Sequence, residues 1–458
     1  MSRRIHFNAF DMSCVGHISS GTWRHPDSQA HRFTDIDYWT SLAELLERGV
    51  FDGLFIADVL GTYDIYAGNH DGALRHASQV PVTDPLLVVS AMAAVTQHLG
   101  FGVTAGTAYE HPYPFARRMS TLDHLTKGRI GWNVVTGYLP SAARNMGHDD
   151  QLEHDDRYDH ADEYLEVLYK LWEGSWEDDA VVFDRETGVY TDPSKVHGIA
   201  HEGQHFKVPG IHLVSPSPQR TPVIFQAGAS KRGIRFAAEH AEAIFVGAPT
   251  KKVLADQVAK IRKALVEAGR DPYAAVIYTL LTIVVDETSE KAQAKYEELL
   301  SYASPEGALV LTSGWMGIDL SAYQLDDPIG VVESNAIQTT VEAFQSESPD
   351  GREWTVGDIA DYSKLGGYGP VLVGSAAEVA DQLQEWVAET DVDGFNISYA
   401  ITPGTFEDVV TYLVPELQRR GVYPTEYEAG TLRNKLHHRG DRLPSEHRGS
   451  AFAARSRA

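Results

Sequence analysis

Short runs of β-branched and aromatic residues alternate along the chain with longer segments in which apolar residues recur at helical spacing. The runs that we interpret as strands span 4–10, 51–59, 100–108, 129–136, 222–228, 242–248, 275–285 and 394–400. This alternation is typical of parallel strands joined by helical crossovers. Eight such strands predict an α/β fold, a (β/α)8 TIM barrel.

Two of the intervening helices have clear signals. One helical face carries Trp39, Leu42, Leu45 and Leu46, and Gly49 is placed to end that helix. Ser375 and Glu378 have the spacing of a capping box, after which apolar residues repeat on one face. This second helix leads into the last predicted strand.

Two segments, 174–221 and 304–369, interrupt the alternation, and the second contains a polar stretch at 345–352. We interpret both as insertions in a single barrel domain of residues 1–432, where long insertions serve as lids or as assembly surfaces. The length and position of the second make it the candidate for a mobile lid. Residues 433–458 are polar and rich in Arg, which predicts a poorly ordered or partner-bound tail.

Composition limits the classes of partner. The chain has 64 acidic and 39 basic residues and a formal charge of −25, which disfavours nucleic acid and anionic membranes as partners. Its single cysteine excludes an intrachain disulfide, and the amino terminus lacks the apolar core of a secretory signal. No apolar run approaches the roughly 18 residues of a membrane span. We therefore expect a soluble protein of the reducing cytoplasm.

Chemistry in such a barrel lies just after the strands, at their carboxyl ends. The fifth predicted strand runs through Gly228, Ala229 and Ser230 directly into a helix that begins near residue 231. Small residues at a helix amino terminus suit an anion such as a phosphate, although Ser230 could equally be an ordinary helix cap. His154, Arg157 and Tyr158 begin another predicted helix, where they could donate to the same anion or simply face solvent.

Other chemistries have weaker signals. Cys14 with His17 could form a thiolate nucleophile, but a lone cysteine is more often a small buried apolar group. No His-x-His pair closes the first strand, so a metal hydrolase is disfavoured and we predict no metal site. Gly100 and Gly102 open a strand instead of preceding a helix, so they form no dinucleotide-binding fingerprint.

Several longer stretches are characteristic: FNAFDMSCVGHISSGTWRHP, FDGLFIADV, ARRMSTLDHLTKGRIGWNVVT, LEHDDRYDHADEYLEVLYKLWEGSWEDDAV and SPQRTPVIFQAGAS. Over nearly the whole chain this pattern resembles the bacterial-luciferase-like FMN-dependent monooxygenases. The branch is that of the nitrilotriacetate, dibenzothiophene-sulfone, dimethyl-sulfide and long-chain alkane enzymes, and the likeness is greatest to the last two.

The resemblance implies a site. It places cofactor contacts at Asp58, Thr104, Gly137, Tyr138, His154, Tyr158, Gly228, Ala229 and Ser230, with the FMN phosphate near Tyr158 and the 228–230 turn. It places the substrate wall at Phe10, Cys14, Tyr63, Gln79, Leu311 and Trp315. His17 is the implied catalytic residue, as a hydrogen-bonding group or proton donor.

The resemblance also implies a reaction. FMNH2 from a separate NAD(P)H-dependent flavin reductase reacts with O2 to give a C4a-peroxyflavin, which oxygenates a small, mostly apolar molecule. Candidate substrates are a long-chain alkane, a thioether such as dimethyl sulfide, or a related sulfur or halogenated compound. The family suggests a homodimer or homotetramer. Two alternatives stay open: a deazaflavin-dependent dehydrogenase of the same superfamily, and a non-catalytic flavin-binding barrel.

Overall fold

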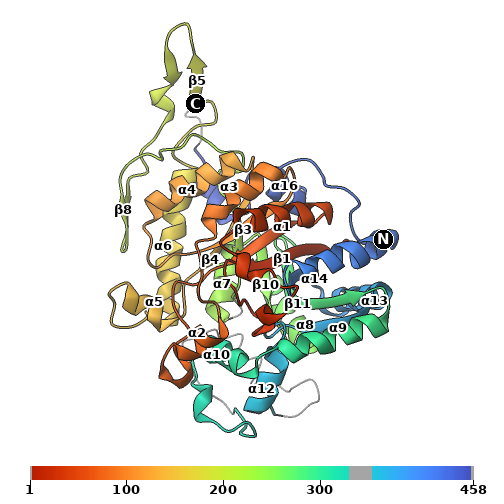
Figure 1. Cartoon of the computed structure of the whole chain (residues 1–458). Helices are drawn as coiled ribbons and strands as arrows, with labels where there is room; N and C mark the ends of the chain where they lie inside the picture. Colours follow the sequence, from red (N-terminus) through yellow and green to blue (C-terminus); the bar gives the residue numbers. More distant parts are fainter. Residues whose placement is uncertain (1–2, 229, 330–352, 455–458) are drawn as a thin grey trace.

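A closed barrel of parallel strands forms the centre of the protein (Figure 1). The structure is a computed structural model, which describes residues 3–228, 230–329 and 353–454. The barrel strands are β1 (His6–Met12), β2 (Gly53–Ala57), β3 (Gly100–Gly106), β4 (Ile130–Val135), β9 (Val223–Gln226), β10 (Ala243–Val246), β11 (Val276–Asp286) and β13 (Gly394–Ser398). They pair in this order, and β13 closes the ring by pairing with β1. The predicted (β/α)8 barrel is confirmed, and each predicted strand lies where the alternation placed it.

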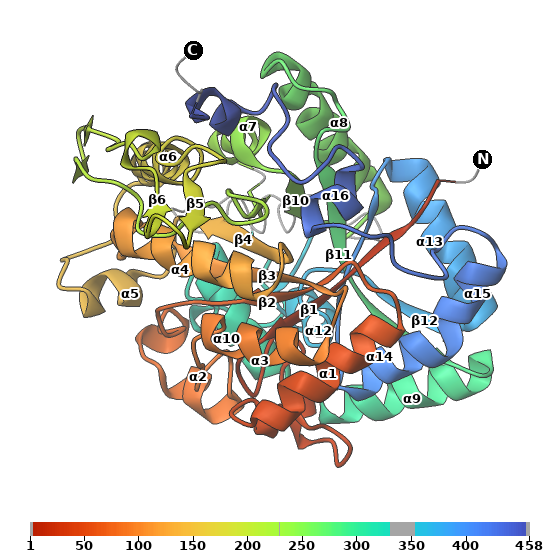
Figure 2. The ribbon, with the colours of Figure 1, turned by 90° about the horizontal axis from the view of Figure 1, so that it is seen from above.

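Helices surround this barrel (Figure 2). The main ones are α1 (Ile36–Arg48), α3 (Leu86–Val95), α4 (Pro112–Leu125), α6 (His154–Trp172), α7 (Lys231–His240), α8 (Lys251–Glu267), α9 (Ser289–Tyr302), α10 (Pro305–Met316) and α13 (Ala376–Thr390). α1 buries the predicted apolar stripe, and the Gly49 N–H donates to the Leu45 carbonyl at its end. α13 begins with the predicted capping box of Ser375 and Glu378. Both helix predictions are confirmed.

Aromatic rings fill the interior of the barrel. Phe225 and Phe245 stack with centroids 5.5 Å apart and planes 5° from parallel, and Phe55 packs on Phe245 at 4.3 Å. Alternate residues of the same strands, such as Leu54 and Ile244, point outward into the helix layer. The packed rings fill the barrel below the carboxyl ends of the strands and close the bottom of the cavity there.

A further strand, β12 (Val371–Ser375), was not predicted. It pairs with residues Thr282–Asp286 at the far end of β11, beyond the point where β11 pairs with β13. Only alternate residues from Val371 to Ser375 are buried, and the strand directly follows a glycine-rich stretch. In the sequence it is therefore hard to tell from a continuation of the 304–369 insertion. β11 is long because it pairs first with β13 and then with β12.

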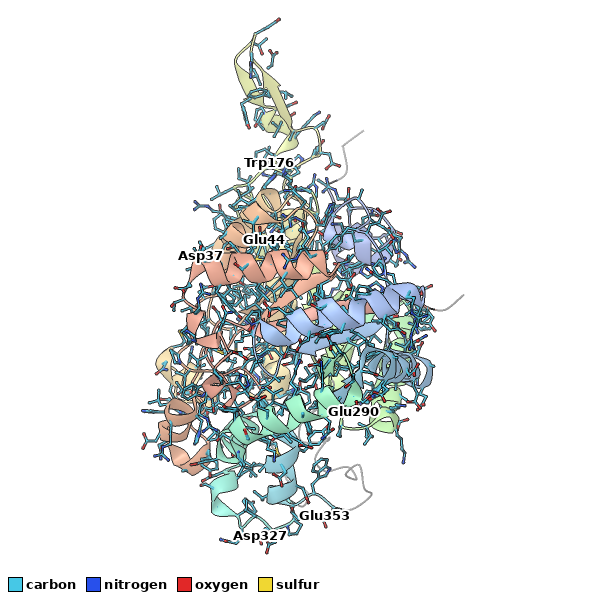
Figure 3. The ribbon with its side chains drawn as sticks, turned by 45° about the vertical axis from the view of Figure 1, so that its right-hand side comes forward. Asp37, Glu44, Trp176, Glu290, Asp327 and Glu353 are labelled. Atoms are coloured by element: carbon cyan, nitrogen blue, oxygen red, sulfur yellow. The ribbon has the colours of Figure 1, made fainter. Side chains whose placement is uncertain are left out.

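The 174–221 segment forms two hairpins. β5 (Val181–Asp184) pairs with β6 (Val189–Thr191) in an arm that projects at the top of Figure 1, and β7 (His201–Glu202) pairs with β8 (Lys207–Val208). Trp176 lies where the arm leaves the body (Figure 3), and its indole N–H donates to the His212 carbonyl at 2.8 Å.

The 304–369 segment is only partly described. It contains α10, whose residues Gly307–Met316 are all buried, and α12 (Val356–Ser363). Residues 330–352 of the predicted lid, which include the polar 345–352 stretch, lie outside the described residues.

The prediction of a poorly ordered tail is wrong for residues 433–454. α16 (Leu432–His437) packs against the barrel at the amino-terminal ends of the strands, where Arg433 is 1% exposed. The guanidinium of Arg433 donates to both carboxylate oxygens of Glu242 and to the Thr221 carbonyl. These acceptors come from distant parts of the chain. The local sequence around Arg433 therefore predicts an exposed arginine. None of the helices that the structure describes is long and apolar enough to cross a membrane.

Candidate functional site

A cavity of about 290 Å³ opens at the carboxyl ends of the strands. All eight barrel strands contribute to its wall, and the loops after β2, β4 and β9 contribute further residues. This is the end of the barrel at which enzymes of this fold place their chemistry.

Most of the residues that the sequence singled out line this cavity. They are Phe10, His17, Asp58, Tyr63, Gln79, Thr104, Gly137, Tyr138, His154, Tyr158, Gly228, Ser230 and Trp315. Cys14 and Leu311 are not among the lining residues, although both are buried. Their predicted place in the substrate wall is therefore not supported. Ala229 lies outside the described residues.

One end of the cavity is polar and lies at the start of α7. The Ser230 hydroxyl accepts the Gly233 N–H at 2.9 Å, so the predicted helix cap is present. Gln226 donates to the Tyr158 hydroxyl at 3.4 Å. A Cβ on Gly228 would lie 2.4 Å from Gln226 Nε2 and 2.9 Å from the Tyr158 hydroxyl oxygen. The absence of a side chain at position 228 thus leaves space for a ligand beside these groups.

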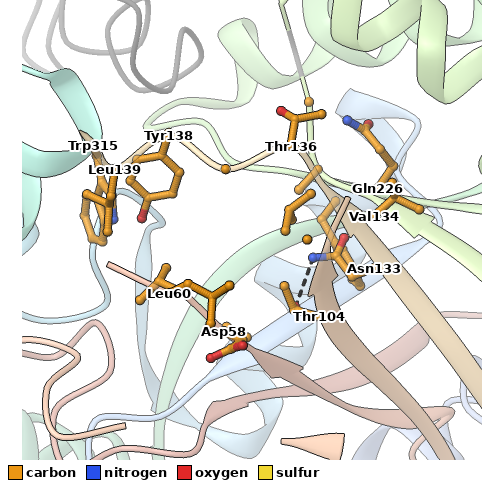
Figure 4. A pocket seen from close by; sticks show the side chains of 18 of the residues that line it. Asp58, Leu60, Thr104, Asn133, Val134, Thr136, Tyr138, Leu139, Gln226 and Trp315 are labelled. Atoms are coloured by element: carbon orange, nitrogen blue, oxygen red, sulfur yellow. Dashed lines mark hydrogen bonds between the residues drawn. The ribbon is translucent and has the colours of Figure 1, made fainter. Parts of the chain in front are cut away.

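The middle of the cavity is lined by the ends of β2, β3 and β4 (Figure 4). Asn133 Nδ2 donates to the Thr104 hydroxyl at 3.1 Å, across the two neighbouring strands. Asp58 follows β2 on the facing side. Burial, together with the nearby carboxylate of Asp84, raises the pKa of Asp58 to about 7.

The opposite end is aromatic. Trp315 and Tyr138 lie together in Figure 4, away from Gln226 and Asn133. The Tyr63 hydroxyl lies 2.5 Å from the Tyr138 hydroxyl, 2.8 Å from Gln79 Oε1 and 3.1 Å from Trp315 Nε1. Trp315 comes from α10, so the 304–369 segment contributes directly to this wall.

His17 is 2% exposed and its ring packs edge-on against Phe10 with centroids 4.4 Å apart. Burial lowers the pKa of His17 to about 3, so the imidazole is neutral at pH 7. Burial raises the pKa of the Cys14 thiol, and its Sγ donates to the Gly16 carbonyl at 3.4 Å. The cysteine is therefore a protonated, buried group, as a lone cysteine usually is.

Several lining residues were not singled out from the sequence. The polar ones are Asn133, Thr136, Gln226 and Asn396, and aromatic ones include Phe55, Phe245 and Tyr368. Asn133 and Gln226 are polar positions inside otherwise apolar strands, and that interruption is a signal that could have been used. Tyr368 had no such signal, because its position depends on how the 304–369 segment folds back.

Asp162, Glu239 and His240 place ligand atoms close enough to hold a metal ion, in the part of the chain that the structure describes. Arg232 pairs with Asp162 at 2.6 Å and Arg448 pairs with Glu239 at 2.5 Å. These acids thus already have cationic partners, and none of the three residues lines the cavity.

Comparison with known proteins gives consistent matches. The model of the luciferase-like monooxygenase family matches residues 12–394. The chain is 54% identical to the dimethyl-sulfide monooxygenase of Hyphomicrobium sulfonivorans over 436 residues, which cover 95% of this chain and 91% of that protein. It is 52% identical to the long-chain alkane monooxygenase of Geobacillus thermodenitrificans over 449 residues, which cover 98% and 97%. A crystal structure of a riboflavin lyase with modified FMN and riboflavin, 39% identical, superposes with a TM-score of 0.92 over 99% of this chain and 100% of that one.

Proposed function

Because this chain belongs to the luciferase-like monooxygenase family, we propose that it binds reduced FMN and uses it with O2 to oxygenate a small, mostly apolar molecule. The observation that carries the proposal is the division of one cavity into a polar end, a middle with buried hydrogen-bonding groups, and an aromatic end. Such a division suits a phosphate, a flat heteroaromatic ring and an apolar substrate in succession.

The polar end fits the phosphate. The first turn of α7 presents backbone N–H groups, and Tyr158 and Arg157 from α6 line the same part of the cavity. Ser230 and Tyr158 would hold the phosphate oxygens, and the missing side chain at Gly228 would admit them.

The middle fits the ring of a flavin. Among the described residues, the buried oxygens Asn133 Oδ1 and Gln226 Oε1 have no hydrogen-bond partner. A buried polar atom without a partner costs free energy, so a ligand that supplies N–H groups there is stabilised. Asn133, Gln226 and Thr104 would hold the polar edge of the ring, and Asp58 faces it from β2.

The aromatic end fits an apolar substrate. Phe10, Leu280 and Trp315 line it, together with Tyr63 and Tyr138. Of the described lining residues, Arg157 alone carries a fixed positive charge, and it lies on α6 beside Tyr158. A substrate with several carboxylates would therefore lack partners at the aromatic end. A thioether or an alkane suits this wall.

The reduced flavin supplies the activation of O2. The chain's own residues bind and orient the reactants and keep water away from the reacting atoms. His17, neutral and almost fully buried, would hold its one N–H at the aromatic end as a hydrogen-bond donor to the reacting atoms.

The proposal includes a separate partner. The sequence has no G-x-G-x-x-G stretch between a strand and a helix, so this chain carries no signal for binding a nicotinamide cofactor. A separate NAD(P)H-dependent reductase would then provide FMNH2. We also include a cytoplasmic setting, which suits the single reduced cysteine, and a homo-oligomeric assembly, for which the family is the reason.

The test is anaerobic mixing of the protein with FMNH2, followed by addition of O2 with an alkane or a thioether present. O2 consumption, oxygenated product and H2O2 are measured together. Product formed in proportion to O2 consumed supports the proposal. Oxidation no faster than that of free FMNH2, without product, would contradict it. Tight binding of a deazaflavin without O2 consumption would favour the dehydrogenase.

A further inference from the structure

Four side chains at the aromatic end form a hydrogen-bonded network around the Tyr63 hydroxyl. Gln79 Nε2 donates to the backbone carbonyl of His17 at 3.2 Å, and Gln79 Oε1 lies 2.8 Å from the Tyr63 hydroxyl. Trp315 Nε1 and the Tyr138 hydroxyl lie 3.1 Å and 2.5 Å from the same hydroxyl. Tyr63 is 1% exposed and Gln79 is 5% exposed, so water has little access to this network.

The chemistry of these groups fixes the direction of each hydrogen bond. A backbone carbonyl only accepts, so the amide nitrogen of Gln79 faces His17 and the amide oxygen faces Tyr63. That oxygen also only accepts, so Tyr63 donates its single proton to it. The indole N–H of Trp315 only donates, so Tyr63 accepts from it.

The remaining contact, between Tyr63 and Tyr138, then has one possible direction. The proton of Tyr63 is already directed to Gln79, so Tyr138 must donate to Tyr63. The opposite order would place two oxygen lone pairs face to face at 2.8 Å, between Tyr63 and Gln79, inside a buried site. The Tyr138 hydroxyl, which also accepts from the Trp315 N–H, is thus left with a lone pair alone for the cavity that it lines.

We propose that this fixed proton order makes Tyr138 a specificity-determining residue, which accepts but does not donate hydrogen bonds at the substrate end. A molecule that places a sulfoxide, sulfone or carboxylate oxygen against Tyr138 meets lone-pair repulsion. An alkyl group does not, and a thioether sulfur, which is only a weak acceptor, meets much less. The substrate class is therefore the unoxidised sulfide or hydrocarbon. The inference rests on the proposed function, because it takes the aromatic end as the substrate site.

Two other polar side chains border this region. His17 Nδ1 is buried without a partner among the described residues, and Tyr368 packs edge-on against Trp315 with centroids 5.6 Å apart. Neither belongs to the network, so both are left unchanged in the variants below.

The test compares two probes with one carbon skeleton, dipropyl sulfide and dipropyl sulfone, by calorimetric titration of the full-length, FMN-loaded protein. Wild type is expected to bind the sulfide more tightly. Tyr63→Phe removes the acceptor for Tyr138 and frees its proton for the cavity. Sulfone binding should then tighten on the order of tenfold, the effect of one hydrogen bond, with the sulfide changed less than about twofold.

Two further variants test the assignment to Tyr138. Tyr63→Phe combined with Tyr138→Phe removes the freed donor and should restore the wild-type ratio of the two affinities. Tyr138→Phe alone should not weaken sulfone binding, and it serves if the Tyr63 variant fails to fold. A sulfone-to-sulfide ratio that Tyr63→Phe leaves unchanged, or sulfone affinity lost in Tyr138→Phe, would overturn this inference alone. Failure of both probes to bind wild type would overturn the apolar substrate and this inference together.

Discussion

Arg433 Nε donates a hydrogen bond to Glu242 Oε1 at 2.6 Å, and the side chains are 1% and 2% exposed. Burial alone would raise the pKa of Glu242, but the charge of Arg433 outweighs burial and lowers this pKa to about 2. The pair joins α16 to the start of β10, and so fixes the end of the chain against the amino-terminal ends of the barrel strands.

Arg433→Met should lower the free energy of unfolding at pH 7 by about 3–5 kcal/mol, because it leaves the Glu242 carboxylate buried without its cation. The folded-state pKa is depressed, so the contribution is complete above the ordinary value of 4.5 and is lost as the pH falls through about 2. Urea unfolding at several pH values should therefore show the difference between wild type and variant shrinking as the pH falls. It shrinks first through the raised pKa of Glu242 in the variant, and further below pH 4.5, where wild type loses its own contribution.

The matched control is Arg439→Ala. Arg439 pairs with Glu446 at 2.7 Å, but the side chains are 43% and 29% exposed. Such pairs contribute at most about 1 kcal/mol. An equal loss of stability in both variants would mean that the buried pair has no special role.

Asp58→Asn should change how stability depends on pH. Burial and Asp84 raise the pKa of Asp58 from 3.8 to about 7, so its stabilising contribution is complete below pH 3.8 and is lost as the pH rises through 7. The Asn variant lacks this loss and should gain on wild type by on the order of 2 kcal/mol between pH 4 and 8. Urea unfolding across this range measures the gain.

Asp84→Asn is the companion variant. It removes the neighbouring charge but keeps the side-chain oxygen that accepts the Leu86 N–H at 2.9 Å. The wild-type transition near pH 7 should move to lower pH. A transition that stays in place would show that Asp84 does not act on Asp58.

Gly228→Ala should weaken the binding of FMN more than that of riboflavin. The new Cβ would lie 2.4 Å from Gln226 Nε2 and 2.9 Å from the Tyr158 hydroxyl, so these groups must move at the end proposed for the phosphate. We expect a loss of about tenfold or more for FMN, comparable to that of one charge-assisted hydrogen bond. Fluorescence titration with both flavins measures it.

Gly210→Ala provides the control, because no atom lies within 4 Å of a Cβ at that position. Both affinities should stay within about twofold of wild type. Equal losses for FMN and riboflavin in Gly228→Ala would argue against a phosphate at this end.

The barrel could be predicted because its signals are local. The eight strands are buried on both faces, so they appear as apolar runs whatever their neighbours are, and the Ser375 and Glu378 cap acts within four residues. β12 and the tail failed for the opposite reason. β12 is a strand only because β11 extends far enough to pair with it, and Arg433 is buried only because Glu242 meets it.

The candidate site divides in the same way. Asp58, Tyr158 and Ser230 follow strands or begin helices, so their positions at one end of the barrel follow from the fold. Tyr368 enters the wall through the path of the 304–369 segment, which no periodicity reveals. The family resemblance supplied Tyr63, Gln79 and Trp315, but the direction of their hydrogen bonds needed the distances.

His17→Gln should uncouple O2 consumption from product formation. The neutral imidazole offers one N–H as a fixed hydrogen-bond donor at the aromatic end, and loss of such a preorganised donor costs about 10²-fold in rate. Because its pKa is about 3, wild type and His17→Gln should share the same pH profile between pH 5 and 9 and differ only in height. His31→Gln, at an exposed position, should match wild type in both product and H2O2. The measurement is the ratio of oxygenated product to H2O2 at pH 6, 7 and 8. A ratio equal to that of wild type would show that His17 only fixes its loop, and a changed pH profile would show that its imidazole titrates in the working range.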